Sequence, residues 1–289
     1  MIVSVPGSSS NLGPGFDCLG IAWKLYDRIA FEVAPSLVIS GCEERFRGPD
    51  NLAYQGFSAA FAEKGLPVPG VHIGFLECDI PVSRGLGSSA ALIAAGAAAA
   101  NAMGRLGLSK EALLDLCTHI EGHPDNLAPS LFGGFTAAVC EDGKAVAASC
   151  PLHPSFRFLA VIPDCELSTS LMRRALPDSF SRSDAVFNLS RTALLMRALE
   201  NGSMDLLRFS LRDRIHQPYR LPLIPGADTV FAEAEKAGAA ACISGAGSTM
   251  LLISDDDAVI RSCREALSKA FPAWKFLSPE PDMKGLEIS

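Results

Sequence analysis

The sequence lacks the features of several protein classes. Lysine and arginine (25) are outnumbered by aspartate and glutamate (32), and the net charge of −7 argues against non-specific binding to nucleic acid or to an anionic membrane surface. The longest apolar run, residues 90–100, is far shorter than the roughly 20 residues of a membrane span. The first ten residues have neither the basic nor the apolar region of a signal peptide. We therefore expect a cytoplasmic protein with no nucleic-acid or membrane partner.

Paired cysteines are also missing. There are nine cysteines, an odd number, and no two of them form a Cys-x-x-Cys pair. Several lie in apolar stretches, which favours reduced thiols that pack as small hydrophobic side chains. A structural zinc site would need a clustering that the sequence does not have. Disulfide-rich and zinc-stabilised folds are therefore not expected.

The two best-known nucleotide-binding motifs are absent, because the chain has neither Gly-x-x-x-x-Gly-Lys-Ser/Thr nor a dinucleotide fingerprint. A different glycine-rich segment, residues 81–91 (PVSRGLGSSAA), joins a predicted strand, residues 71–78, to a predicted buried helix, residues 88–103. Glycine lets the backbone approach an anion, and the unpaired N–H groups and dipole of a helix start favour negative charge. We interpret this segment as a phosphate loop. A plain strand-to-helix turn with a serine cap is the alternative for the Gly-x-Gly-Ser-Ser core alone.

A second candidate segment is the hexapeptide of residues 121–126 (EGHPDN), which ends a helix that begins at Ser109. A glutamate at a helix C-terminus is unfavourable unless a cation compensates it. Mg²⁺ bound to phosphate would do so, because it prefers carboxylate and phosphate oxygens. The alternatives are a solvated Glu121, a structural His123, and a turn made by Asp125 and Asn126.

Two further polar, glycine-rich connections are residues 7–17 and 244–248. The first offers Asn11 and Asp17 as oriented polar groups, and Asp17 is suited to pair with a substrate ammonium. Asn and Asp are also common in loops without function, and a tight hairpin turn equally explains residues 244–248.

The order of predicted elements indicates an α+β fold with two halves, residues 1–150 and 151–289, since strands and helices mix without strict alternation. In the first half we expect strands at 2–6, 18–25, 29–33 and 71–78, with 18–33 folded as a hairpin, and helices at 51–64, 88–103 and 109–121. In the second half we expect strands at 156–162, 242–244, 249–253 and 274–277 and helices at 184–199, 204–215, 228–237 and 256–271.

Together these segments resemble the GHMP kinase superfamily and, within it, the homoserine kinases. The three glycine-bearing segments carry the superfamily resemblance, while residues 11–17 (NLGPGFD) and 121–126 are more specific. Residues 167–173 (LSTSLMR) and 218–220 (PYR) are similar to substrate-binding segments of the family. The resemblance implies a two-lobed fold, with a ribosomal-protein-S5-like N-terminal lobe that binds ATP and a ferredoxin-like C-terminal lobe. It also implies ATP- and Mg²⁺-dependent phosphorylation of L-homoserine to O-phospho-L-homoserine, a step of threonine biosynthesis.

The resemblance further implies roles for individual residues. Glu121, with Ser88 or Ser89, would hold Mg²⁺, and Asn126 would orient the substrate hydroxyl where related kinases have an aspartate base. Thr169 would lie beside the phosphoryl acceptor. ATP would be bound by Pro81, Val82, Ser83, Arg84, Gly85, Leu86, Gly87, Ser88, Ser89, Ala90 and Ala91. The substrate would be bound by Asn11, Asp17, His123, Asn126, Arg173, Arg220 and Gly245.

Some points stay open at this stage. Arg174 competes with Arg173 for the substrate carboxylate, and Asn51, Leu52 and Tyr54 are weak candidates for the adenine pocket. Rival functions are another small-molecule kinase of the superfamily, acting on a sugar or mevalonate, and a non-catalytic ligand sensor. A homodimer is one candidate assembly, which the sequence does not decide.

Overall fold

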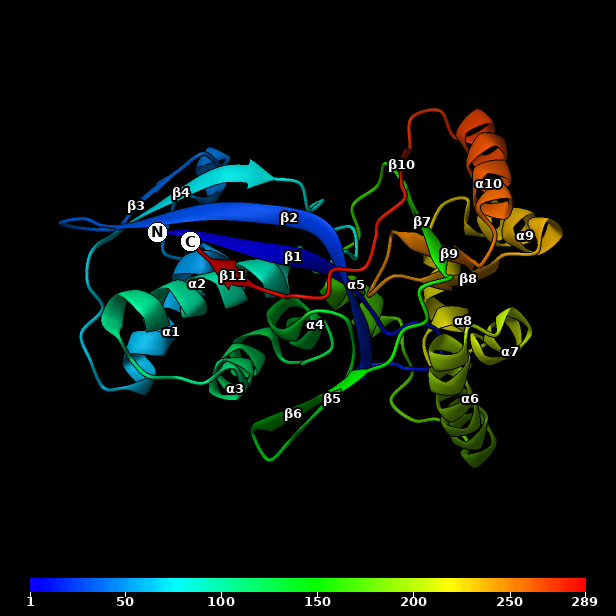
Figure 1. Ribbon diagram of the computed structural model, residues 1–289, viewed down its shortest axis with the longest axis horizontal. Helices are drawn as coiled ribbons and strands as arrows, with labels where there is room; N and C mark the ends of the chain where they lie inside the picture. The colour runs from blue at the N-terminus through cyan, green and yellow to red at the C-terminus, as the bar shows by residue number, and fades with distance from the viewer.

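The computed structural model describes residues 1–289, and these form two lobes placed side by side (Figure 1). The first lobe contains a seven-stranded sheet in the order β11-β1-β2-β4-β3, with β5 paired to β2 and β6 to β5. The second contains a four-stranded sheet in the order β10-β7-β9-β8. The mixture of strands and helices confirms the α+β prediction. None of the helices is both long and apolar enough to cross a membrane.

The elements of the first lobe are β1 (Ile2–Ser10), β2 (Leu19–Val33), β3 (Val38–Ser40), the short 3₁₀ helix η1 (Glu44–Phe46), α1 (Leu52–Glu63), β4 (Val71–Cys78), α2 (Ser88–Gly104), α3 (Lys110–Glu121), α4 (Leu127–Phe132), β5 (Phe135–Glu141) and β6 (Lys144–Cys150). Helices α1 to α4 lie below β1, β2 and β4 in Figure 1 and cover one face of the sheet. The helix predicted to begin at Ser109 is confirmed, because the Ser109 hydroxyl caps α3 by accepting a backbone N–H group. Asn51, which the sequence did not identify as a cap, caps α1 in the same way.

The elements of the second half are β7 (Arg157–Ile162), α5 (Thr169–Arg174), α6 (Arg182–Asn201), α7 (Met204–Ser210), α8 (Gln217–Arg220), η2 (Leu221–Leu223), α9 (Ala227–Ala237), β8 (Ala240–Ile243), β9 (Met250–Ser254), α10 (Asp257–Ala270), β10 (Lys275–Leu277) and β11 (Glu287–Ile288). The predicted helix at 204–215 ends early, at Ser210, because Asp213 starts a separate turn that leads into α8.

The second sheet has two apolar faces. Along β7, Phe158 and Ala160 belong to a core of 51 buried residues that also contains the core of the first lobe, whereas Leu159 and Val161 belong to a smaller core of 14 residues against α9 and α10. This alternation follows from the two-residue period of a strand. Trp23 and Phe158 meet edge to face with their ring centroids 4.9 Å apart, so one continuous core joins the lobes.

The predicted hairpin at residues 18–33 is wrong, because β2 is one uninterrupted strand of 15 residues. Tyr26 and Asp27, which had suggested a turn, instead find partners far along the chain. The Tyr26 hydroxyl donates to Asp282 at 2.6 Å, and Asp27 accepts from the Ile80 amide at 3.1 Å. Likewise, residues 7–10 are not loop but extend β1, which pairs with β2 from Gly7 to Ser10 after a register shift.

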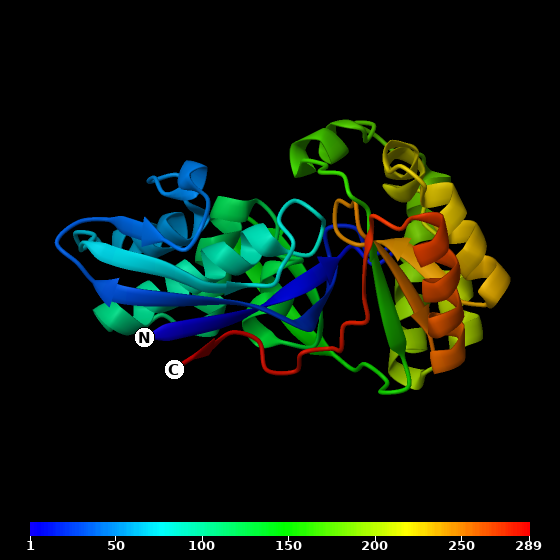
Figure 2. The same cartoon turned by 90° about the horizontal axis from the view of Figure 1, so that it is seen from above.

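The last residues return to the first lobe. The C-terminal segment leaves β10, runs back along the first sheet and ends beside the N-terminus (Figure 2). Strand β11 pairs with β1, and Pro281 forms an isolated bridge with Trp23. We call residues 279–289 the C-terminal strap. The division of the chain at residue 150 stays a prediction.

Candidate active site

A cavity of about 600 Å³ is bounded by both lobes. Four groups of residues line it: the phosphate loop, the hexapeptide of residues 121–126, the end of β1 with the loop after it, and residues of the second half. The lining residues used below are Ser10, Asn11, Asp17, Asp27, residues 81–89, Glu121, His123, Asp125, Asn126, Thr169, Arg173, Arg220 and Gly245. The structure therefore brings together the predicted site residues except Ala90 and Ala91, which are fully buried in the core.

The start of α2 presents backbone N–H groups that no side chain caps. Its N-cap residue is Gly87, in the left-handed conformation with φ of 74°, so the predicted alternative of a serine cap is wrong. A β-carbon at Gly87 would lie 2.2 Å from the Ser8 hydroxyl oxygen, so both the conformation and the close approach require glycine. Uncapped amides at the start of a buried helix of 17 residues form a site suited to an anion.

Glu121 lies directly beside this helix start. The Ser89 hydroxyl donates a hydrogen bond of 2.5 Å to Glu121 Oε2. Burial raises the pKa of Glu121, although the Ser89 bond and the nearby His123 partly offset that effect. No cationic side chain forms an ion pair with Glu121, and no cluster of three acidic, histidine or cysteine ligands exists in the chain. One carboxylate and one hydroxyl oxygen suit Mg²⁺, which commonly takes one or two carboxylates and completes its shell with phosphate and water.

Asn126 lines the cavity, and hydrogen bonds hold its side-chain amide at both ends. Its Oδ1 accepts from the Ser8 hydroxyl and its Nδ2 donates to the Ser10 hydroxyl, both at 2.9 Å. Ser8 and Ser10 face the same side of β1 because strand side chains alternate. Asp125 Oδ1 is 2.9 Å from His123 Nδ1 and accepts from the Asn126 amide. Burial lowers the pKa of His123, but the hydrogen bond and charge of Asp125 outweigh it, so that the pKa lies above its ordinary value.

The two arginines of the cavity have different partners. Arg173 forms a two-pronged ion pair with Asp17, with distances of 3.0 Å from Nη1 and 2.7 Å from Nη2. Arg220 is 1% exposed and donates hydrogen bonds only to neutral acceptors: the carbonyls of Met172 and Gly245 and the imidazole of His216. Burial and the charge of Arg173 lower the pKa of Arg220 to about 10. A buried guanidinium without a carboxylate partner is a strong site for an anionic ligand.

Sequence reasoning gave no role to several lining residues. Asp125 lies inside the recognised hexapeptide but was interpreted only as a turn residue. Ser10 lines the cavity, and Ser8, which does not, contacts Asn126. Their signal is the alternation of polar residues along a strand, which the prediction of a loop in this segment missed. Asp27 was assigned to a hairpin turn, so its position in the cavity had no signal in the sequence.

Comparisons with known proteins show the family of the chain. The family model for the GHMP kinase N-terminal domain matches residues 51–134, and the model for the GHMP kinase C-terminal domain matches residues 195–273. The chain is 38% identical to homoserine kinase of Clostridium beijerinckii over 99% of this chain and 97% of that protein. The chain belongs to the homoserine kinase family. A homoserine kinase from Clostridium botulinum strain Kyoto is 40% identical over 88% of this chain and 86% of its own length.

Solved structures give the same fold for this homoserine kinase family member. The crystal structure of homoserine kinase from Cytophaga hutchinsonii superposes with a TM-score of 0.89, covering 100% of this chain and 97% of that one at 26% identity. A mevalonate kinase from Methanococcus jannaschii superposes with a TM-score of 0.72 at 13% identity, over 97% of this chain and 98% of that one, which shows the shared fold alone. The two-lobed GHMP kinase fold predicted from the sequence is thus confirmed.

The structure locates three groups of candidate residues, which the sequence left undecided, relative to the cavity. Arg173 lines the cavity, whereas Arg174 is exposed outside it. Among the adenine candidates, Asn51 and Leu52 line the cavity and Tyr54 does not. Both serines of the 88–89 pair line it, and Ser89 is the one bonded to Glu121.

Proposed function

We propose that this protein is a homoserine kinase, which transfers the γ-phosphoryl group of ATP to the side-chain hydroxyl of L-homoserine. The observation that carries the proposal is one cavity that holds both halves of such a reaction. Uncapped helix amides suit a nucleotide phosphate, and the Ser89–Glu121 pair suits the Mg²⁺ that accompanies it. Arg173 and Arg220 suit the carboxylate of an amino acid.

In this proposal residues 81–89 wrap the phosphates of ATP, and Ala90 and Ala91 support the loop from the core. Glu121 and Ser89 would hold Mg²⁺, whose chemistry is to neutralise phosphate charge. Phosphoryl transfer depends mainly on alignment and charge stabilisation, so the protein need not form a covalent intermediate.

The amino-acid end of homoserine matches the charges of the second half of the cavity. Asp17 and Asn11 would face its ammonium group, and Arg220 with Arg173 its carboxylate, while Gly245, His123 and Thr169 shape the pocket around it. In the structure Asp17 and Arg173 bind each other. When the zwitterionic substrate binds, its ammonium group can take the place of Arg173 beside Asp17, and its carboxylate can take the place of Asp17 beside Arg173. Each charged side chain therefore keeps a partner of opposite charge.

Asn126 would orient the hydroxyl of homoserine without acting as a base, and the proton would pass directly to the γ-phosphoryl group. The hydrogen bonds to Ser8 and Ser10 support this role because they fix the amide in one orientation. Asn126→Ala should lower kcat with ATP and homoserine by on the order of a hundredfold, measured in a coupled ADP-release assay. Unchanged kcat would remove Asn126 from the mechanism.

The same assay across homoserine, threonine, mevalonate and galactose tests the function itself. We expect ADP release with homoserine only, and phosphorus NMR should identify O-phosphohomoserine as the product. Release with mevalonate or galactose instead would favour another kinase of the superfamily, and no release with any substrate would favour a ligand sensor. The homodimer stays a prediction, to be measured by light scattering.

A further inference from the structure

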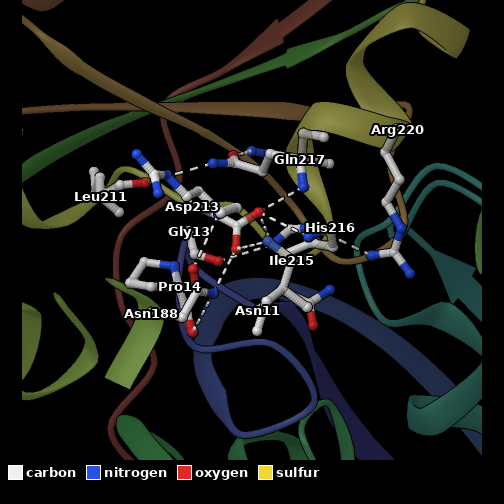
Figure 3. A network of polar contacts seen from close by, with 12 residues as sticks. Asn11, Gly13, Pro14, Asn188, Leu211, Asp213, Ile215, His216, Gln217 and Arg220 are labelled. Carbon is white, nitrogen blue, oxygen red and sulfur yellow. Dashed lines mark hydrogen bonds and ion pairs between the residues drawn. The ribbon is translucent and has the colours of Figure 1, made fainter. Parts of the chain in front are cut away.

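A buried polar network contacts Arg220 (Figure 3), and its central residue, His216, does not line the cavity. His216 is its centre and has no exposed surface. The His216 Nε2 atom lies 2.7 Å from the carbonyl oxygen of Gly13, and its Nδ1 lies 3.4 Å from Arg220 Nη1. One imidazole thus connects the loop of residues 11–17 to the guanidinium that we assign to the substrate carboxylate.

The chemistry of these two contacts fixes the protonation of His216. A carbonyl oxygen only accepts hydrogen bonds, so Nε2 carries the proton and donates it to Gly13. The Asp213 carboxylate, 3.7 Å from the same nitrogen, also favours a proton there. A guanidinium only donates, so Nδ1 has a free lone pair and accepts from Arg220. The imidazole is therefore neutral. Burial lowers the pKa of His216, and the charge of Arg220 lowers it further against the opposing charge of Asp213, which agrees with this assignment.

The rest of the network holds His216 and α8 in place. Asp213, also without exposed side-chain surface, accepts hydrogen bonds from the amides of Ile215, His216 and Gln217 and from Asn188 Nδ2. The His216 ring stacks on Phe16 with centroids 5.3 Å apart. The Arg220 guanidinium carbon also lies over the Phe16 ring, 5.2 Å from its centroid.

Contacts within the chain hold two of the three guanidinium nitrogens of Arg220. Its Nε donates to Met172 and its Nη1 to Gly245 and His216, while Nη2 makes no hydrogen bond within the chain. Because Arg220 lines the cavity, Nη2 is the atom left for a ligand. Because His216 is a neutral acceptor, it orients Nη1 and leaves the positive charge of the guanidinium available. A carboxylate in the same place would neutralise that charge.

We propose that His216 is a positioning residue that, through Arg220, sets the affinity for the carboxylate of the amino-acid substrate. The inference rests on the proposed function. It assigns a role in substrate selection to a side chain that does not line the cavity. A purely structural His216 would affect folding and both substrates alike, whereas a positioning His216 affects the amino acid alone.

Two substitutions separate the two contacts of the ring. In His216→Gln the amide nitrogen can still reach Gly13, but no acceptor remains at the Nδ1 position. In His216→Asn the side-chain oxygen lies near the Nδ1 position and keeps an acceptor for Arg220. Gln217→Leu is the matched control, because it removes two buried hydrogen bonds of the same turn, to Leu211 and Ile243, without contacting Arg220.

The test measures KM for homoserine and for ATP in each variant, with thermal unfolding of each. We expect His216→Gln to raise KM for homoserine by roughly tenfold to a hundredfold with little change in KM for ATP. His216→Asn and Gln217→Leu should stay near the wild-type KM for homoserine. In an Arg220→Met background the effect of His216→Gln on kcat/KM should vanish, because coupled residues are not additive.

The outcomes that overturn the inference are distinct from failure of the function. If wild-type protein does not phosphorylate homoserine, both proposals fall. If it does, the inference alone is overturned when Gln217→Leu raises KM for homoserine as much as His216→Gln does, or when His216→Gln keeps its full effect beside Arg220→Met. Should His216→Gln not fold, a tenfold rise in His216→Asn overturns it equally.

Discussion

Glu121 occupies a position that is unfavourable for stability. It ends α3, where the helix dipole disfavours an anion, and burial raises the pKa of its carboxyl group. No ion pair offsets these effects within the chain. The Ser89 hydrogen bond and the nearby His123 offset only part of the cost, since the pKa stays raised. A residue whose local cost is not fully compensated is commonly functional, so substitution of Glu121 should change activity and stability in opposite directions.

Glu121→Gln should therefore lower kcat/KM by on the order of a hundredfold or more, while its melting temperature stays equal or rises. The reason for the second part is the sign of the pKa shift: with a raised pKa in the folded state, the ionised carboxylate destabilises the fold at neutral pH. Steady-state kinetics and calorimetry on one preparation check both parts. A lower melting temperature that explains the lost activity would contradict the assignment.

Asp27 gives a second test at the residue scale. Burial raises its pKa from 3.8 to about 6. Between these values the folded state binds more protons than the unfolded state, so wild-type stability should fall as pH rises from about 4 to about 6. Asp27→Asn removes this dependence and should be more stable by about 2 to 3 kcal/mol at pH 7 and equal near pH 4. Urea unfolding at several pH values measures the difference, and a difference constant with pH would refute the shift.

The sequence predicted the residues of this site better than their interactions. The phosphate loop and the hexapeptide could be identified because glycine and helix-end chemistry are local. The ion pair of Asp17 with Arg173 could not, since 156 positions separate the two residues. The sequence assigns each of them to a charged group of the substrate, and nothing in the local sequence shows that the two side chains meet.

At the scale of elements, α1 and α2 form the closest helix pair of the first lobe. A β-carbon added to Gly96 would lie 1.8 Å from the Ala53 carbonyl oxygen, and one at Gly56 would lie 2.1 Å from that of Ile93. The two helices thus touch backbone to backbone. This contact explains the alanine-rich sequence of α2, since larger side chains on that face would separate the helices that hold the phosphate loop.

Gly96→Ala should destabilise the protein by about 2 kcal/mol or more, although alanine normally stabilises a helix relative to glycine. The matched control is Gly48→Ala, where a β-carbon meets nothing within 4 Å and stability should change by less than about 0.5 kcal/mol. Denaturant unfolding of both variants gives the comparison. Equal stability of the two would show that α1 and α2 can separate at little cost.

Element prediction was wrong where long-range contacts override local preference. Strand β2 passes through Tyr26 and Asp27 because distant partners satisfy both side chains. The hairpin of β5 and β6 was not predicted, although Asp142 and Gly143, with φ of 50° and 76°, form the Asp-Gly turn typical of hairpins. That signal was local and available.

At the scale of the whole molecule, the C-terminal strap ties the second lobe to the first. Asp282 is its anchor: its side chain accepts from the Tyr26 hydroxyl and from the amides of Lys284 and Gly285. Sequence patterns gave no hint of this return, because residues 279–289 have neither strand alternation nor helical periodicity. The position of the strap is set by its contacts with β1 and Tyr26, which are far away in the sequence.

Asp282→Ala should lower the free energy of unfolding by about 3 kcal/mol, because it leaves the buried Gly285 amide and two partly buried donors without their acceptor. Glu287→Ala is the control, since its ion pair with Lys284 is exposed and should contribute less than about 1 kcal/mol. Chemical denaturation distinguishes the two. Similar losses in both variants would mean that Asp282 does not anchor the strap.

The central claim is that the start of α2 and Glu121 hold the phosphates of a nucleotide next to an amino acid bound by Arg220. A crystal structure with Mg²⁺, a non-hydrolysable ATP analogue and homoserine tests it most directly. The account predicts phosphate oxygens against the amides of residues 87–90, the metal ion on Glu121, and the homoserine carboxylate on Arg220 Nη2. A triphosphate bound away from α2, or a Glu121 side chain that contacts neither metal nor phosphate-bound water, would contradict it.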